Sequence, residues 1–281
     1  MKIKLIIGMM MVMGMAGIAR GAAQEKTWIF LLWGQSNMKG RGDVAELPAS
    51  FKTPDPRISM FHFKDDKWCP AKDPMHSGGD VDAIDKSGNA GVGPGLAFAR
   101  KMAEMKKGVK IGLVPCAQGG SVVELWKPGA KLYVAGIERA RKALASVPGG
   151  GEIKGVLWLQ GESDAMNKKN SAGVLRKTVY EKELCSVVDG VRKDLGIPDL
   201  PFIAGTVGEF SIGPNKPYIK EINAILLKLP SLRKNTACVD ARDLMSHLDV
   251  WHFDTAAQLK YGPRYAEKFL SLTEKAGKGG K

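Results

Sequence analysis

The chain has 281 residues, of which 44% are hydrophobic and 25% are charged, and its formal net charge is +13. This composition is typical of a globular protein and excludes a disordered or fibrous one, and a chain of this length can bury a core that needs neither metal nor disulfide to fold. The basic residues do not form a helix with interleaved aromatic residues, so nucleic acid is not an expected partner.

The N-terminal segment has the pattern of a secretory signal peptide. Lys2 and Lys4 precede an apolar run over residues 5–18, and small residues follow up to Ala23. We expect a signal peptide over residues 1–23, cleaved after Gly21 or Ala23. The alternative is an uncleaved membrane anchor, although the apolar run is short for a bilayer span of about 20 residues. After cleavage we expect a secreted or periplasmic protein with no membrane span.

Cleavage of the signal peptide also changes the charge of the chain. Loss of Lys2, Lys4 and Arg20 lowers the net charge from +13 to +10. The lysine- and glycine-rich residues 275–281 are predicted to form a flexible basic tail. The predicted domain over residues 24–274 then carries about +7, which is more typical of a solvated surface than of a polyanion-binding face.

Five short apolar runs predict buried parallel strands, over residues 28–32, 110–114, 153–159, 202–206 and 236–239. Helical patterns separate them, over residues 94–106, 133–145, 171–195 and 218–229. A last helical region follows Asp254, a good N-cap, and Gly262-Pro263 predicts a kink in it or a break into two short helices. This alternation favours one α/β domain with a parallel sheet.

Between the first strand and the first helix lies a long segment, residues 34–93, rich in Gly, Pro and Asp. A loop of this length in a compact domain is usually functional. Ligands of an open parallel sheet bind beyond the carboxyl ends of its strands. Polar segments follow four of the predicted strands at that edge, over residues 34–38, 115–121, 160–164 and 240–252.

Three residues in these segments are candidates for nucleophilic catalysis. Ser36 is the candidate nucleophile, with the alternative that it caps a helix beginning at Asn37. His252 is the candidate base, and Asp249, three residues earlier, can fix its tautomer. His252 could instead be an ordinary surface histidine. Asp254 is a rival orienting carboxylate, but we interpret it as a helix cap.

Acyl transfer also needs donors for a developing oxyanion. The backbone N–H of Ser36, a backbone N–H at Gly119-Gly120 and the side-chain amide of Gln160 are available. Alternatively, the two glycines form a plain turn, and Gln160 and Glu162 belong to a polar surface loop.

Taken together, four segments give the chain a family resemblance. They read GQSNM at 34–38, GGS at 119–121, QGESD at 160–164 and DVWHF at 249–253, and GPRYA at 262–266 supports them. From about Trp28 to Leu272 the chain resembles the SGNH hydrolases, and within them the carbohydrate esterases with a sialate O-acetylesterase-type domain. It is most similar in appearance to carbohydrate esterase family 6, which includes acetylxylan esterases.

The resemblance implies a three-layer α/β/α sandwich with a central parallel five-stranded sheet of flavodoxin-like type. It implies a metal-free serine esterase, without cofactor, that removes acetyl groups from an acetylated polysaccharide or oligosaccharide. It assigns Ser36, His252 and Asp249 to the triad, and Ser36, Gly120 and Gln160 to the oxyanion hole. Gln160 stands where the general pattern has asparagine. The supporting residues are Gln35, Asn37, Gly119 and Glu162, and Glu162 is an alternative partner for His252.

Other readings of the sequence remain open. The substrate could be sialate, pectin or another acetylated glycan instead of xylan. The fold could also serve as a non-catalytic carbohydrate-binding protein, or hydrolyse lipids or thioesters. Trp33, Trp68, Trp126 and Trp251 could stack on sugar rings or belong to the core.

The four cysteines, Cys69, Cys116, Cys185 and Cys238, are too few for a disulfide scaffold and allow three pairings, between which the sequence does not choose. The oligomeric state is likewise not encoded in any pattern that we can identify.

Overall fold

The computed structural model describes residues 26–76, 90–246 and 248–278. The predicted signal peptide lies outside the described residues, and so do residues 279–281 of the predicted tail. No helix among the described residues is long and apolar enough to cross a bilayer.

A seven-stranded sheet forms the centre of the molecule, in the order β3-β2-β4-β1-β5-β6-β7. Its strands are β1 Thr27–Gly34, β2 Ile58–Phe61, β3 Trp68–Pro70, β4 Ile111–Pro115, β5 Gly151–Leu159, β6 Phe202–Gly205 and β7 Thr236–Val239. All neighbours pair in parallel except β3, which is antiparallel to β2. The α/β class and the parallel sheet are confirmed.

The expected strand number was wrong, since the sheet has seven strands and not five. The five predicted strands are β4, β1, β5, β6 and β7, and they follow the flavodoxin-like order 2-1-3-4-5. The additional strands β2 and β3 come from the long segment 34–93, which was expected to be a loop. They are short, and β3 ends on Pro70 at the edge of the sheet, where a proline costs no ladder hydrogen bond.

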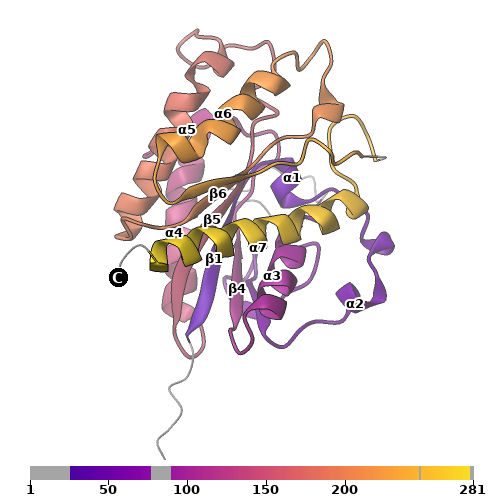
Figure 1. Cartoon of the computed structure of the whole chain (residues 1–281), viewed down its shortest axis with the longest axis vertical. Coiled ribbons are helices and arrows are strands. Elements are labelled where there is room, and N and C mark those ends of the chain that lie inside the picture. Colours follow the sequence, from indigo (N-terminus) through magenta and orange to yellow (C-terminus); the bar gives the residue numbers. More distant parts are fainter. Residues whose placement is uncertain (1–25, 77–89, 247, 279–281) are drawn as a thin grey trace, which may run out of the picture.

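Helices cover both faces of the sheet. The helices are α1 Ser36–Lys39, α2 Ala49–Lys52, α3 Pro94–Met105, α4 Lys131–Ser146, α5 Arg176–Leu195, α6 Ile219–Leu232 and α7 Thr255–Lys278. Helices α3 and α7 lie together on one face, and the other face packs against α4, α5 and α6 (Figure 1). Three single turns of 3-10 helix, η1 Val44–Glu46, η2 Val123–Trp126 and η3 Glu209–Ser211, lie in the connections.

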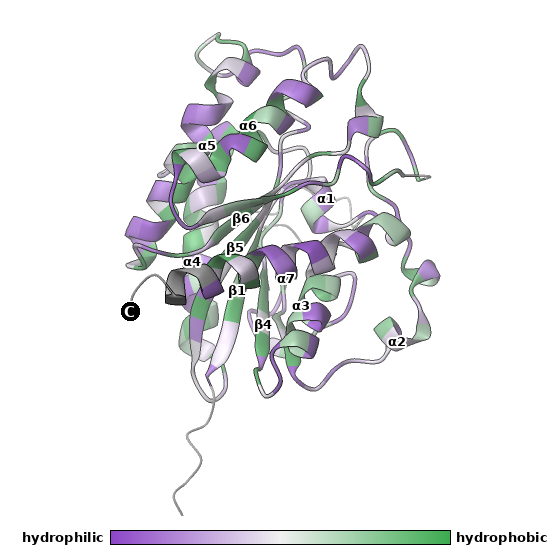
Figure 2. Ribbon diagram, viewed as in Figure 1, coloured by the Kyte–Doolittle hydropathy of each residue, from purple (hydrophilic) through white to green (hydrophobic). Residues whose placement is uncertain are grey.

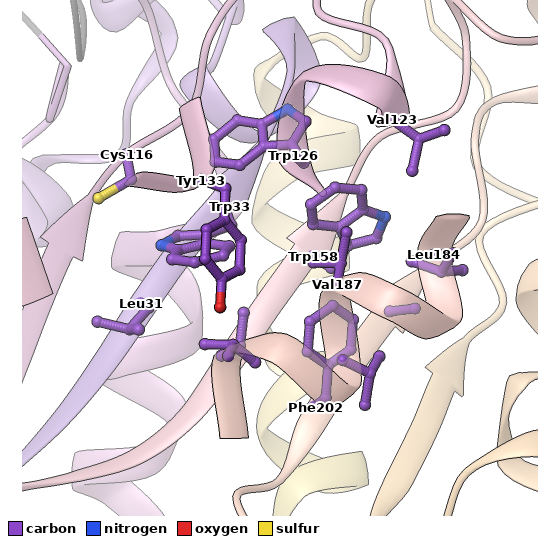
Figure 3. Packing of buried hydrophobic residues seen from close by; sticks show 14 of the residues in the cluster. Leu31, Trp33, Cys116, Val123, Trp126, Tyr133, Trp158, Leu184, Val187 and Phe202 are labelled. Carbon is purple, nitrogen blue, oxygen red and sulfur yellow. The ribbon is translucent and has the colours of Figure 1, made fainter. Parts of the chain in front are cut away.

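The central strands are coloured mainly as hydrophobic, whereas the helices carry both hydrophilic and hydrophobic residues along their length (Figure 2). On the α4–α6 face, the core contains a run of aromatic side chains (Figure 3). The ring centroid of Trp126 lies 5.5 Å from that of Trp33 and 5.7 Å from that of Trp158. Trp33 and Trp126 are fully buried, so they belong to the core and are not available to stack on a sugar.

Of the two alternatives expected at Gly262-Pro263, a kink or two short helices, the second is wrong, because α7 runs without a break through these residues. Pro263 removes one backbone donor. Packing on α3 offsets this loss, since Gly262 lets the two helices approach closely: a Cβ at this position would lie 2.4 Å from the carbonyl oxygen of Pro94. Tyr261 and Tyr265 are fully buried on either side of the proline. The helix also extends to Lys278, into the segment expected to be a flexible tail.

Candidate active site

Strand register brings the polar segments to one edge of the sheet. Leu32 of β1 pairs with Pro115 of β4, and Gly34 pairs with Leu159 of β5. The three strands therefore end side by side. Because β1 lies between β4 and β5, its end is the point where the strand order reverses, and this is where open α/β sheets bind ligands.

Gly34 forms the sharp exit from β1. Its φ is +140°, and a Cβ there would lie 2.1 Å from the carbonyl oxygen of Leu159. Only glycine suits this position. Ser36 follows as the first residue of α1, while Gln35 occupies the cap position and makes no side-chain cap bond. The alternative that Ser36 caps a helix is therefore wrong, and its hydroxyl is left for another partner.

That partner is His252. Its Nε2 lies 3.1 Å from Ser36 Oγ, and its Nδ1 lies 2.8 Å from Asp249 Oδ2. Asp249 Oδ1 also accepts the backbone N–H groups of Trp251 and His252, at 2.6 and 2.7 Å. A carboxylate on Nδ1 fixes the tautomer whose Nε2 can accept the serine proton. The structure thus brings the three predicted triad residues together.

Asp249 is held as a carboxylate. Burial raises the pKa of this group, but the hydrogen bonds from the His252 ring and from two backbone N–H groups outweigh burial, and the net pKa lies below its usual value. Asp254, the rival, instead accepts the N–H of Ala257 at 2.8 Å and caps α7 as expected.

Two of the expected oxyanion donors are backbone groups. The N–H of Ser36 stands at the start of α1, and the N–H groups of Gly119 and Gly120 lie in the turn after β4. None of these three N–H groups donates a hydrogen bond to an acceptor among the residues that the structure describes. Gly120 is exposed with φ +69°, and no atom lies within 4 Å of the place a Cβ would take. This open turn leaves room for a ligand above it.

Gln160 does not have the expected position. The side chain is fully buried, and its Nε2 donates to Asp164 Oδ2 at 2.5 Å and to the Ser121 carbonyl at 3.0 Å. Because both amide hydrogens face acceptors inside the protein, no donor remains for an oxyanion. Gln160 instead connects the segments that follow β4 and β5. Gln35 belongs to the same hydrogen-bond network, because its Oε1 accepts the N–H groups of Gly161 and Ser163, both at 3.3 Å.

Asp164, at the centre of this buried network, was not singled out in the sequence. Burial raises its pKa to about 7, and the hydrogen bonds from Gln160 and from the N–H of Val123 offset only part of that effect. A polar residue five positions beyond a strand end gives no signal of its burial, so only the fold identifies it.

Glu162, the alternative partner of His252, forms no hydrogen bond with the ring, whose two nitrogens face Asp249 and Ser36. It accepts a short hydrogen bond from Asn37 Nδ2. Both side chains are buried.

Lys216 is a further residue that sequence reasoning missed. It is only 4% exposed, and its Nζ lies 3.7 Å from the centroid of the Trp251 ring, a cation–π contact. Burial lowers its pKa, while the charges of Glu162 and Asp249 act in the opposite direction. A single lysine in a Gly- and Pro-rich loop carries no recognisable pattern.

The site residues show no arrangement for a metal. No group of three or more His, Cys, Asp or Glu side chains suited to hold a metal ion occurs in the described ranges. All four cysteines are free thiols, and Cys116, Cys185 and Cys238 are buried.

A serine, a histidine and an aspartate joined in this order at the edge of a doubly wound sheet form the arrangement that serine hydrolases use. Comparison with known proteins identifies the family. Residues 26–271 match the family model described as carbohydrate esterase, sialic acid-specific acetylesterase. The chain belongs to this family, whose members are carboxylic ester hydrolases, and the expected enzyme class is confirmed.

Individual relatives agree with this assignment. The chain is 34% identical over 258 residues to a probable carbohydrate esterase from Arabidopsis thaliana, covering 86% of this chain and 90% of the relative. A solved Arabidopsis thaliana structure superposes with a TM-score of 0.74 at 31% identity, covering 88% of this chain and 98% of the other. The crystal structure of NanS matches with a TM-score of 0.68 at 21% identity over 90% and 99% of the two chains, and supports the fold alone.

Proposed function

We propose that this protein is an exported serine carbohydrate esterase that removes O-acetyl groups from an acetylated polysaccharide or sugar, with acetylated xylan as the first candidate substrate. The observation that carries the proposal is the continuous link from Asp249 through His252 to Ser36, at 2.8 and 3.1 Å. Export rests on the signal-peptide pattern of residues 1–23.

The proposed reaction has two steps. Ser36 Oγ attacks the acetyl carbonyl carbon while His252 Nε2 takes the hydroxyl proton, and the backbone N–H groups of Ser36 and Gly120 face the developing oxyanion. The tetrahedral intermediate collapses, the sugar oxygen leaves with the proton from His252, and an acetyl-serine ester remains. Water, deprotonated by His252, then attacks this ester, and acetate leaves as Ser36 regains its proton.

Sialate is the second candidate substrate, because the family description names sialic acid-specific acetylesterases. A substrate panel separates the two. We expect acetate release from acetylated xylan with a higher kcat/KM than from O-acetyl sialic acid, and little hydrolysis of long-chain p-nitrophenyl esters. Preference for the sialate ester would reassign the sugar, and preference for long acyl chains would contradict a carbohydrate esterase.

A further inference from the structure

Asn37, the residue after Ser36, contacts the chain on both sides of His252. The side chain is fully buried. Its Oδ1 accepts the backbone N–H of Phe253 at 3.0 Å, and its Nδ2 donates to the carbonyl of Trp251 at 3.3 Å. One amide therefore binds the residue before the base and the residue after it.

Two neighbours fix the orientation of Asn37. Glu162 accepts a short hydrogen bond from Asn37 Nδ2, so the NH₂ group faces Glu162 and the oxygen faces Phe253. Gln258 of α7 donates from Nε2 to the main-chain carbonyl of Asn37 at 2.9 Å. Glu162 therefore fixes the side-chain amide of Asn37, and Gln258 fixes its main chain, and both of these partners are buried.

The segment that carries the base needs such an anchor. Ser246 Oγ donates to the carbonyl of His252, and Asp249 accepts the N–H groups of Trp251 and His252. These bonds shape the segment internally, but they do not set its distance from Ser36. The Asn37 bonds do, because Asn37 shares the backbone of α1 with the serine.

We propose that Asn37 is a positioning residue that sets the distance between His252 and Ser36, and that Glu162 acts on the base through Asn37. This inference rests on the proposed esterase function. It assigns Glu162 a role different from that of a triad carboxylate, since its contact to the base runs through an amide and the backbone.

The test measures kcat and KM for p-nitrophenyl acetate in Asn37 variants. Misplacement of a reacting group by about 1 Å costs on the order of 100-fold, so N37S should lower kcat by about 100-fold with KM within about twofold. N37D should lose at least as much, because it places a carboxylate against Glu162. The double variant N37D/E162Q restores a hydrogen bond of reversed polarity and should recover at least about tenfold of the N37D loss.

Asn223 of α6 offers a matched control. It is also buried, and it binds one loop residue in the same manner, accepting the N–H of Val207 at 2.8 Å and donating to its carbonyl at 3.0 Å. N223S should lower Tm comparably to N37S but leave kcat within about twofold, since each substitution removes a buried amide that binds backbone groups of another segment.

Three outcomes would overturn the positioning role: an unchanged kcat in N37S, equal kcat losses in N37S and N223S, or no recovery in N37D/E162Q. The double-variant comparison does not depend on N37S folding well. Failure of the proposed function is distinguishable, because it would appear first in the wild type, as no acetate release and no labelling of Ser36 by a fluorophosphonate.

Discussion

The two halves of the candidate active site are built differently. The nucleophile half is buried: Ser36 is 7% exposed, and its neighbours Gln35 and Asn37 are less so. The base half is open, with the side chains of His252 and Asp249 exposed by 22% and 40%, and with Val250 between them exposed by 62%. The sheet fixes the nucleophile, whereas a surface segment presents the base and depends on contacts from the buried half.

If the open half functions as an orienting unit, D249N should lower kcat far more than a substitution of Glu162 does. Asn cannot hold the required tautomer of His252, so we expect kcat to fall by about 10³- to 10⁴-fold. E162Q, in the buried half, keeps an oxygen acceptor for Asn37 and should lose less than about tenfold. Steady-state kinetics of both variants check this, and a larger loss in E162Q than in D249N would make Glu162 the orienting carboxylate.

Substitution of glycine tests the rigidity of the buried half. G34A places a Cβ against the Leu159 backbone at a positive φ, so the unfolding free energy should fall by about 3 kcal/mol or more. G120A, in the open turn after β4, meets no atom and should lose only about 1–2 kcal/mol for the left-handed backbone. Denaturant unfolding measures both, and equal losses would mean that the exit from β1 adapts to a side chain.

The buried half should also make stability depend on pH. Since the pKa of Asp164 is about 7 in the folded protein, the folded state keeps a proton that the unfolded chain, with a pKa near 3.9, releases. The contribution of Asp164 to stability is therefore fully present below about pH 4 and is lost as pH rises toward 7, by up to about 1.4 kcal/mol per unit.

D164N removes this titration and should flatten the pH dependence of the unfolding free energy. Burial also raises the pKa of Asp73 to about 7, so D73N/D164N should lose more of the slope between pH 4 and 7 than D164N alone. An unchanged slope in D164N would show that Asp164 is already ionised in the folded protein at low pH.

Much of the fold follows from local pattern. The five apolar runs become β1, β4, β5, β6 and β7, because a strand buried on both faces has to be apolar throughout. The strands β2 and β3 lack this signal, because they are only four and three residues long. β2 pairs with the edge of β4 that faces away from β1, and β3, which is less buried, pairs with β2 at the edge of the sheet.

The sequence predicted the parts of the site whose position follows from the sheet topology, but not the parts whose position depends on individual side-chain contacts. Ser36 and the segment with His252 had to share an edge of the sheet, and Asp249 lies within reach of the ring by its spacing. The direction of the Gln160 amide depends on Asp164 and the Ser121 carbonyl, which meet it only in the folded chain. Lys216 joins the site through a contact with Trp251 that no spacing encodes.

The central claim is that Ser36 carries the acetyl group during turnover. The most direct measurement is mass spectrometry of peptides from enzyme quenched in acid during hydrolysis of p-nitrophenyl acetate, for wild type and S36A. The account predicts an acetylated peptide containing Ser36 in the wild type, and in S36A no such peptide with at least about a thousandfold loss of kcat. Acetate release by S36A at the wild-type rate, with no acetyl group on Ser36 in either protein, would contradict it.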